Sequence, residues 1–158
     1  CARTGGRAKH HGQAHRRAYP KTIVKKWFVD ANMFLRFFTQ DDAGQGAMAK
    51  RIFQKAATGE VLLVVGPPVL FEVAWTLRSA YRQPQDKVVE VLRAILGTAG
   101  IEVLDAAVVE EALRRSEETG VEFADAYIMA ASIAEGCDAI ATFNRSDFVK
   151  LGAKMADL

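Results

Sequence analysis

The sequence has few of the residues on which several kinds of site depend. Its two cysteines, Cys1 and Cys137, are far apart, which argues against a disulfide framework or a cysteine-based metal site and fits a reduced, cytoplasmic setting. All three histidines lie within residues 10–15, so the remaining chain offers no Ser/His or Cys/His pair for acyl transfer. Glycine-rich phosphate loops of the types GxxxxGK[ST] and GxGxxG are also missing after every predicted strand.

Long apolar runs are absent as well. The longest, such as residues 61–65, are far too short to span a bilayer, and no hydrophobic signal-peptide region follows the basic start of the chain. We therefore expect no membrane segment. With 158 residues, half of them apolar, the sequence predicts one folded domain with a substantial core.

Acidic residues are absent before Asp30. Eight of the 21 Lys and Arg residues lie in residues 1–26. Residues 27–158 therefore hold 13 basic residues and all 19 acidic ones, which gives them a net charge of −6. We predict that residues 1–22 form a disordered basic tail, native or not, and that residues 23–158 form the folded domain. An acidic body binds nucleic acid poorly unless local patches, the tail or metal ions supply positive charge.

Apolar periodicity predicts strands that alternate with pairs of helices, an order typical of α/β proteins. Such an order favours a three-layer α/β/α sandwich with a mostly parallel central sheet. The first strand, which is apolar, is expected to be buried and central. The predicted strands are 23–30, 61–65, 101–104 and 138–142, and the predicted helices are 32–38, 42–58, 67–81, 85–97, 106–118 and 123–135, with Asp105 as a helix cap.

Three acids stand in apolar surroundings, where a charge is costly unless it is paired or bound to metal. They are Asp30, Glu72 and Asp125, each near a strand end or in the first turns of a helix that leaves one. Asp147 follows the last predicted strand and makes a fourth. Because these positions converge on one edge of a parallel sheet, we expect one acidic site.

The supporting residues are oxygen donors too. Thr142 and Asn144 lie beside Asp147 in sequence, and Asn32 follows Asp30 closely. Hard oxygen ligands without His or Cys favour Mg²⁺, with Mn²⁺ as an alternative, over zinc. Clustered carboxylates with such ions typically act on phosphates.

Four windows of the sequence together resemble the signature segments of PIN-domain ribonucleases, and within them the VapC-type toxins of toxin–antitoxin pairs. The windows are Val29–Asn32, Val69–Val73, Phe123–Ala126 and Ala141–Phe148. The resemblance implies a PIN-like domain and Mg²⁺- or Mn²⁺-dependent hydrolysis of RNA that leaves 5′-phosphate and 3′-hydroxyl ends. It also implies a homodimer and inhibition by a cognate antitoxin protein.

Carried over by position, the resemblance makes Asp30 and Asp125 the principal metal ligands. Glu72, which binds the metal directly or through water, and Asp147 become the third and fourth catalytic acids and metal ligands. Asn32, Thr142 and Asn144 are in support. Which of Asp147 and Asn144 faces the metal is left open. The basic tail lies outside the family pattern.

Other interpretations of the same residues stay open at this point. Asp30 could cap the following helix, Glu72 could pair with Arg78, and Arg36 and Arg145 could contact RNA phosphates. The whole chain could be a housekeeping RNA-processing nuclease of the same fold, or a non-catalytic α/β binding module. A short upstream gene that encodes a DNA-binding antitoxin would favour the toxin over the housekeeping nuclease.

Overall fold

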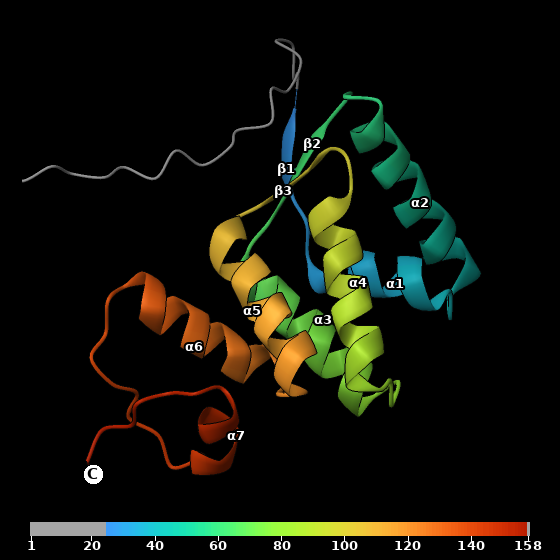
Figure 1. Ribbon diagram of the computed structural model, residues 1–158. Helices are drawn as coiled ribbons and strands as arrows, with labels where there is room; N and C mark the ends of the chain where they lie inside the picture. The colour runs from blue at the N-terminus through green and yellow to red at the C-terminus, as the bar shows by residue number, and fades with distance from the viewer. Residues whose placement is uncertain (1–24, 158) are drawn as a thin grey trace, which may run out of the picture.

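The computed structural model describes residues 25–157, which form a parallel sheet surrounded by helices (Figure 1). Strands β1 (Lys26–Phe28), β2 (Leu62–Val65) and β3 (Ile101–Val103) lie side by side in the order β1-β2-β3. Trp27 lies opposite Leu63, and Leu63 lies opposite Ile101. Both strand pairs are parallel, so the predicted α/β class is confirmed.

Helices connect the strands in pairs, as the apolar periodicity predicted. Two helices join β1 to β2, two more join β2 to β3, and three follow β3. They are α1 (Ala31–Thr39), α2 (Ala43–Ala57), α3 (Pro67–Ser79), α4 (Gln85–Gly97), α5 (Ala106–Thr119), α6 (Phe123–Ala134) and α7 (Arg145–Lys150). No helix within residues 25–157 is long and apolar enough to cross a membrane.

Local signals set several helix ends. The Asp42 carboxylate caps α2 by accepting a 2.9 Å hydrogen bond from the Gln45 backbone N–H. Pro67 opens α3, where its missing N–H costs nothing. Asp105 takes the predicted N-cap position of α5, but its backbone is left-handed, with a φ of 54°, and its side chain makes no capping hydrogen bond.

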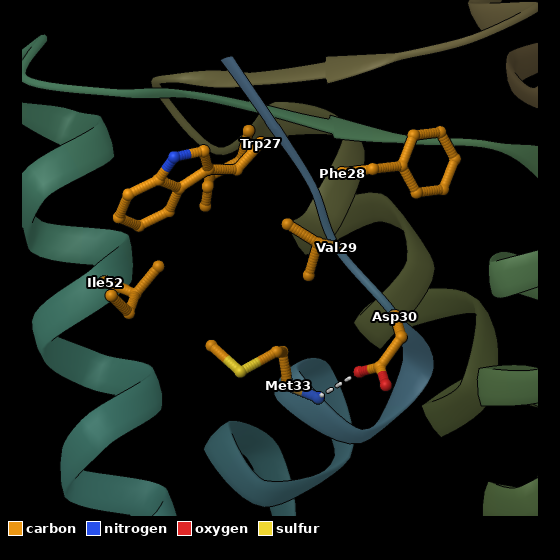
Figure 2. A pocket seen from close by; sticks show the side chains of 7 residues that line it. Trp27, Phe28, Val29, Asp30, Met33 and Ile52 are labelled. Atoms are coloured by element: carbon orange, nitrogen blue, oxygen red, sulfur yellow. Dashed lines mark hydrogen bonds between the residues drawn. The ribbon is translucent and has the colours of Figure 1, made fainter. Parts of the chain in front are cut away.

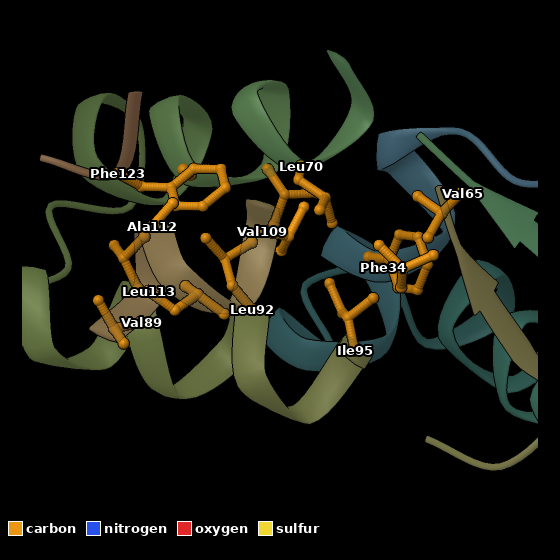
Figure 3. Close-up of a cluster of buried hydrophobic side chains, with 14 of the residues drawn as sticks. Phe34, Val65, Leu70, Val89, Leu92, Ile95, Val109, Ala112, Leu113 and Phe123 are labelled. Carbon is orange, nitrogen blue, oxygen red and sulfur yellow. The ribbon is translucent and has the colours of Figure 1, made fainter. Parts of the chain in front are cut away.

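The core lies between the sheet and the helices that cover it. All four residues of β2 are buried, which shows that both faces of this strand are covered. Figure 3 shows side chains from α1, α3, α4, α5 and α6 meeting in one apolar cluster. Phe34, Leu70, Leu92, Leu113 and Phe123 are each no more than 1% exposed and form its centre.

Two predictions about strands were wrong. The first strand was expected to be buried and central, but β1 lies at one edge of the three-stranded sheet and its three residues are exposed. Residues 138–142 were expected to form a fourth strand. Within residues 25–157 they pair only through a single parallel bridge between Ile140 and Met155. Strand neighbours are chosen by contacts distant in sequence, which apolar runs cannot reveal.

The C-terminal part of the chain stands apart from β1. Figure 1 shows α7 and the residues after it beyond α6, at the opposite end of the molecule from β1. The predicted tail, residues 1–22, lies outside the described residues.

Candidate functional site

Asp30 follows β1 directly and begins α1. Its Oδ1 accepts a 3.3 Å hydrogen bond from the Met33 backbone N–H, so the carboxylate caps the helix (Figure 2). An open pocket of about 490 Å³ lies beside it, lined mostly by apolar side chains. The second carboxylate oxygen stays available, because the cap uses one oxygen. Asn32, two residues further along the chain, is exposed.

Asp125, Asn144 and Asp147 form a second polar group, here called the amide cluster. The Asn144 Nδ2 group donates to the Asp125 Oδ2 and to the Asp147 Oδ2, each at 3.1 Å. Asp125 lies in the first turn of α6 and Asp147 in the first turn of α7. The Asn144 side chain therefore ties the starts of two helices together through their carboxylates.

The two carboxylates of the amide cluster are in different electrostatic situations. The pKa of Asp125 is raised above its ordinary value, first by burial and then by the negative charges of Asp147 and Glu122. The pKa of Asp147 is lowered, first by the hydrogen bond from Asn144 and then by that from Lys150. Asp125 is thus a carboxylate that a nearby cation would help to keep ionised.

Thr142, Ser146 and Lys150 complete the surroundings of the amide cluster. The Asn144 backbone N–H donates to the Thr142 Oγ1 at 3.0 Å, and the Ser146 hydroxyl donates to the Asn144 Oδ1 at 3.3 Å. The Lys150 Nζ donates to the Asp147 Oδ1 at 3.1 Å. Sequence reasoning missed Lys150, although its spacing of three residues from Asp147 in a short helix was a usable signal.

The predicted acids do not form one cluster in this structure. Within residues 25–157, no three His, Cys, Asp or Glu side chains are placed so that they could hold one metal ion. Glu72 is exposed on α3, and its predicted alternative partner, Arg78, instead pairs with Glu122 at 3.4 Å. The structure brings Asp125, Asn144 and Asp147 together, with Thr142 beside them, and leaves Asp30 and Glu72 outside this group.

Arg36 was a candidate for contact with phosphate, but its Nε and Nη1 groups bind other side chains of the protein. Its guanidinium donates to both carboxylate oxygens of Asp41, at 2.8 and 2.7 Å, and its Nε donates to the Gln45 side chain at 2.9 Å. Arg145, the other candidate, is exposed next to Asn144. Arg145 is therefore better placed than Arg36 to meet an anionic ligand at the amide cluster.

The family comparison confirms the predicted resemblance to PIN domains. Residues 27–154 match the model of the PIN domain family. The crystal structure of the sarcin–ricin loop cleaving toxin VapC20 from Mycobacterium tuberculosis matches with 23% sequence identity and a TM-score of 0.37. That match covers 84% of this chain and 99% of the VapC20 chain. Among proteins with curated descriptions, none is similar enough in sequence to count as a match.

Proposed function

Because the chain belongs to the PIN domain family, we propose that it is a metal-dependent endoribonuclease and the toxin of a toxin–antitoxin pair. The observation that carries this proposal is the match of the family over residues 27–154, which includes all four acids singled out in the sequence. The amide cluster supports it, because two carboxylates held close together at a partly exposed position suit a cation-dependent site.

The donors present fit a hard divalent cation in their chemistry. Asp125 and Asp147 offer carboxylate oxygens, and the Asn144 side chain holds both in place. These groups would hold Mg²⁺ or Mn²⁺, which prefer oxygen ligands. Asp30 and Glu72, also proposed as acids of the site, lie apart from them within residues 25–157. When bound, such a cation makes water a stronger nucleophile and stabilises the charge of a phosphate that is being cleaved.

The residues of the chain contribute positioning and charge. The Asn144 amide fixes the separation of Asp125 and Asp147 by donating to the Oδ2 atom of each. The Lys150 Nζ donates to the other carboxylate oxygen of Asp147, Oδ1. Burial of Asp125 raises its pKa, so the carboxylate gains more from a positive charge than an exposed one does. Arg145 is exposed beside these groups and would contact the RNA backbone.

The partners follow from the same proposal. The substrate is RNA, and a cognate antitoxin protein inhibits the enzyme by covering the amide cluster. A homodimer is the proposed assembly. The acidic net charge of residues 27–158 means that RNA must be held by local basic groups and by cations, since phosphates are otherwise repelled.

The test is cleavage of purified RNA by the full-length protein, freed of any bound partner. Wild type should cleave with Mg²⁺ or Mn²⁺ and stop when EDTA is added. Asp125→Asn keeps the hydrogen-bonding shape but removes the charge, and we expect a loss of at least about 100-fold, the size typical for removing one electrostatic group from an active site.

The matched control is Asp86→Asn. Asp86 is also an aspartate in the first turn of a helix, but it lies on α4. This variant should cleave as wild type does. Equal activity of Asp125→Asn and wild type would remove Asp125 from the site. No cleavage by wild type with Mn²⁺, together with no stabilisation by that ion, would favour a non-catalytic binding module.

A further inference from the structure

We propose that the exposed side of α2 holds the phosphate backbone of the RNA substrate through Lys50, Arg51 and Lys55, here called the basic face of α2. The proposal rests on the proposed function, because it takes RNA as the substrate. The charge of α2, the ion pairs of the other basic residues and the place of α2 beside the pocket at Asp30 support it.

α2 is a positively charged helix in an acidic domain. It contains three basic residues and no acidic one. Lys50, Arg51 and Lys55 are all exposed. Residues 27–158 as a whole carry a net charge of −6, which repels RNA. A phosphate backbone that approaches this domain is therefore attracted to α2 and kept from most of the remaining surface.

The three basic side chains lie together on the outer side of α2. The inner side is marked by the buried residues of the helix, Ala49, Phe53 and Ala56. At about 3.6 residues per turn, Arg51 lies opposite that inner side, with Lys50 and Lys55 on either side of it. A rise of about 1.5 Å per residue places all three within about 7.5 Å along the helix axis. A single stretch of RNA backbone can therefore meet all three.

Most other basic residues within residues 25–157 are paired with carboxylates. The distances in these ion pairs run from 2.5 to 3.4 Å. The paired residues are Lys26, Arg36, Arg78, Lys87, Arg93, Arg114, Arg115 and Lys150. Lys50, Arg51 and Lys55 form no such pair in this part of the chain. Their charges are available to an anion from outside the protein.

The acids that flank α2 are engaged elsewhere. Asp41 binds the Arg36 guanidinium. The Asp42 carboxylate caps α2 itself. Glu60, which follows the helix, accepts a 3.0 Å hydrogen bond from the Thr58 hydroxyl. None of these three carboxylates neutralises the basic face of α2.

The spacing of the basic residues costs the helix stability. Arg51 and Lys55 are four residues apart, and like charges at this spacing destabilise a helix. Lys55 lies in the last turn, where the helix dipole favours a positive charge. Lys50 and Arg51 lie further from that end and gain less from the dipole. A bound phosphate would relieve the repulsion and explain why these charges are kept together.

The basic face of α2 borders the pocket beside Asp30. Ile52 follows Arg51 in the helix and lines the same pocket as Asp30. Figure 2 shows Ile52 projecting from α2 into this pocket, across from Asp30. RNA held on α2 would therefore be led toward Asp30. Contacts with phosphates fix the position of the strand and carry no sequence information, so the basic face sets affinity and orientation, not the target sequence.

Binding of RNA in EDTA tests the basic face without any cleavage. The full-length protein, freed of any bound partner, is titrated against fluorescently labelled single-stranded RNA of mixed sequence. Fluorescence anisotropy gives the Kd at several NaCl concentrations. The test variant is Lys50→Gln/Arg51→Gln/Lys55→Gln, because glutamine removes the charge and keeps a similar helix propensity. All proteins contain the basic residues before Lys25, so their contribution cancels in the comparison.

The salt dependence of binding reports the number of phosphate contacts. For single strands, each contact contributes about 0.7 to the slope of log affinity against log salt concentration. The loss of three contacts should lower the magnitude of this slope by about 2. The affinity advantage of wild type over the variant should then shrink roughly 20-fold between about 50 and 200 mM salt. An unchanged slope would overturn the proposal.

The matched control removes the same charge from another place. Lys87→Gln/Arg93→Gln/Arg114→Gln also lowers the net charge by three, but each of these residues pairs with a glutamate on α4 or α5. This variant should keep the wild-type slope. An equal decrease in both variants would show an effect of net charge alone and overturn the proposal. The fold of each variant is checked by circular dichroism.

A charge-preserving variant separates loss of charge from damage to the helix. Lys50→Arg/Arg51→Lys/Lys55→Arg keeps three positive charges on α2 and should bind with the wild-type slope. A slope as low as that of the glutamine variant would contradict a role for charge at these positions.

Cleavage with Mn²⁺ distinguishes this proposal from the proposed function. Removal of contacts that hold substrate and transition state equally raises KM and leaves kcat unchanged, which is the result expected for the glutamine variant. Wild type that binds RNA through α2 but cleaves none would contradict the proposed function and leave the basic face supported. Wild type that cleaves RNA, with a glutamine variant of equal KM and equal salt slope, would refute the basic face alone.

Discussion

Replacement of Gly100 by alanine tests how the end of α2 packs against the turn before β3. Gly100 has a φ of +79°, and its carbonyl accepts a 2.9 Å hydrogen bond from the Leu63 N–H of β2. A Cβ added there would lie 2.2 Å from the Ala56 carbonyl oxygen, 2.4 Å from its carbon and 2.9 Å from the Ala56 Cβ. The Ala56 atoms are mostly backbone and cannot rotate away, so the turn or the helix must shift.

The expected loss of stability has two parts. The left-handed backbone costs an alanine about 1–2 kcal/mol. Forcing a methyl group into a packed contact costs about 1–3 kcal/mol more. Gly100→Ala should therefore lower the free energy of unfolding by about 2–5 kcal/mol, and each kcal/mol lowers the Tm of a domain of this size by about 2–4 °C.

Gly120→Ala is the matched control, measured in the same urea and thermal unfolding series. Gly120 has a φ of +70°, but a Cβ added to it would have nothing within 4 Å. The control should show the backbone cost of about 1–2 kcal/mol and no more. Equal losses in the two variants would mean that the end of α2 does not contact the turn at Gly100.

Three further predictions concern the amide cluster, the turn after α1 and the core. Asn144→Asp removes the amide that two carboxylates share and adds a negative charge, so without divalent cations the variant should have a lower Tm than wild type. Mn²⁺ should raise the Tm of the variant by more than it raises that of wild type. Equal shifts of Tm in the two proteins would contradict the described cluster. The hydrogen bonds from Tyr81 and then Arg36 lower the pKa of Asp41 from 3.8 to about 2. The stabilisation of the fold by the ionised Asp41 is therefore present above pH 3.8 and lost as the pH falls toward 2. In Asp41→Asn the loss of stability on the acid side should be smaller, and an unchanged pH profile of stability would refute this role of Asp41. Phe123 is 1% exposed, so Phe123→Ala should lower the free energy of unfolding by about 3–5 kcal/mol, measured with denaturant. Trp75 is 70% exposed, so Trp75→Ala should change it by less than about 1 kcal/mol. Similar losses in the two variants would contradict the described core.

Local chemistry allowed most helix boundaries to be predicted from the sequence. The Asp42 cap and the proline at the start of α3 act within a few residues, so a short window contains the whole cause. Asp105 takes its predicted N-cap position, but its left-handed backbone differs from the extended conformation of a usual cap residue, and its side chain makes no capping hydrogen bond. That backbone conformation could not be predicted from the residue types alone.

The arrangement of strands depended on contacts that a single sequence does not contain. The apolar residues around Trp27 and Phe28 look like a buried strand in either position, central or edge. Residues 138–142 have the apolar run of a strand, but a strand needs a neighbour, and here the pairing on one side is limited to Ile140 with Met155.

The candidate site was predictable in part. Asp125, Asn144 and Asp147 were singled out from apolar surroundings and from their place near predicted strand ends, and the structure brings them within hydrogen-bonding distance. Asp30 and Glu72 were expected at the same edge and lie outside this group. The difference is physical: one side-chain amide links the first three, whereas Asp30 follows the edge strand β1 and Glu72 is exposed on α3.

The most direct test of the central claim maps the new ends of total RNA after treatment with the purified protein and Mn²⁺. Wild type should create discrete cleavage sites with 5′-phosphate and 3′-hydroxyl ends. Asp30→Ala protein that keeps the wild-type fold by circular dichroism should create none of them. Identical end maps for the two proteins, or no new ends with wild type, would contradict a metal-dependent ribonuclease that uses Asp30.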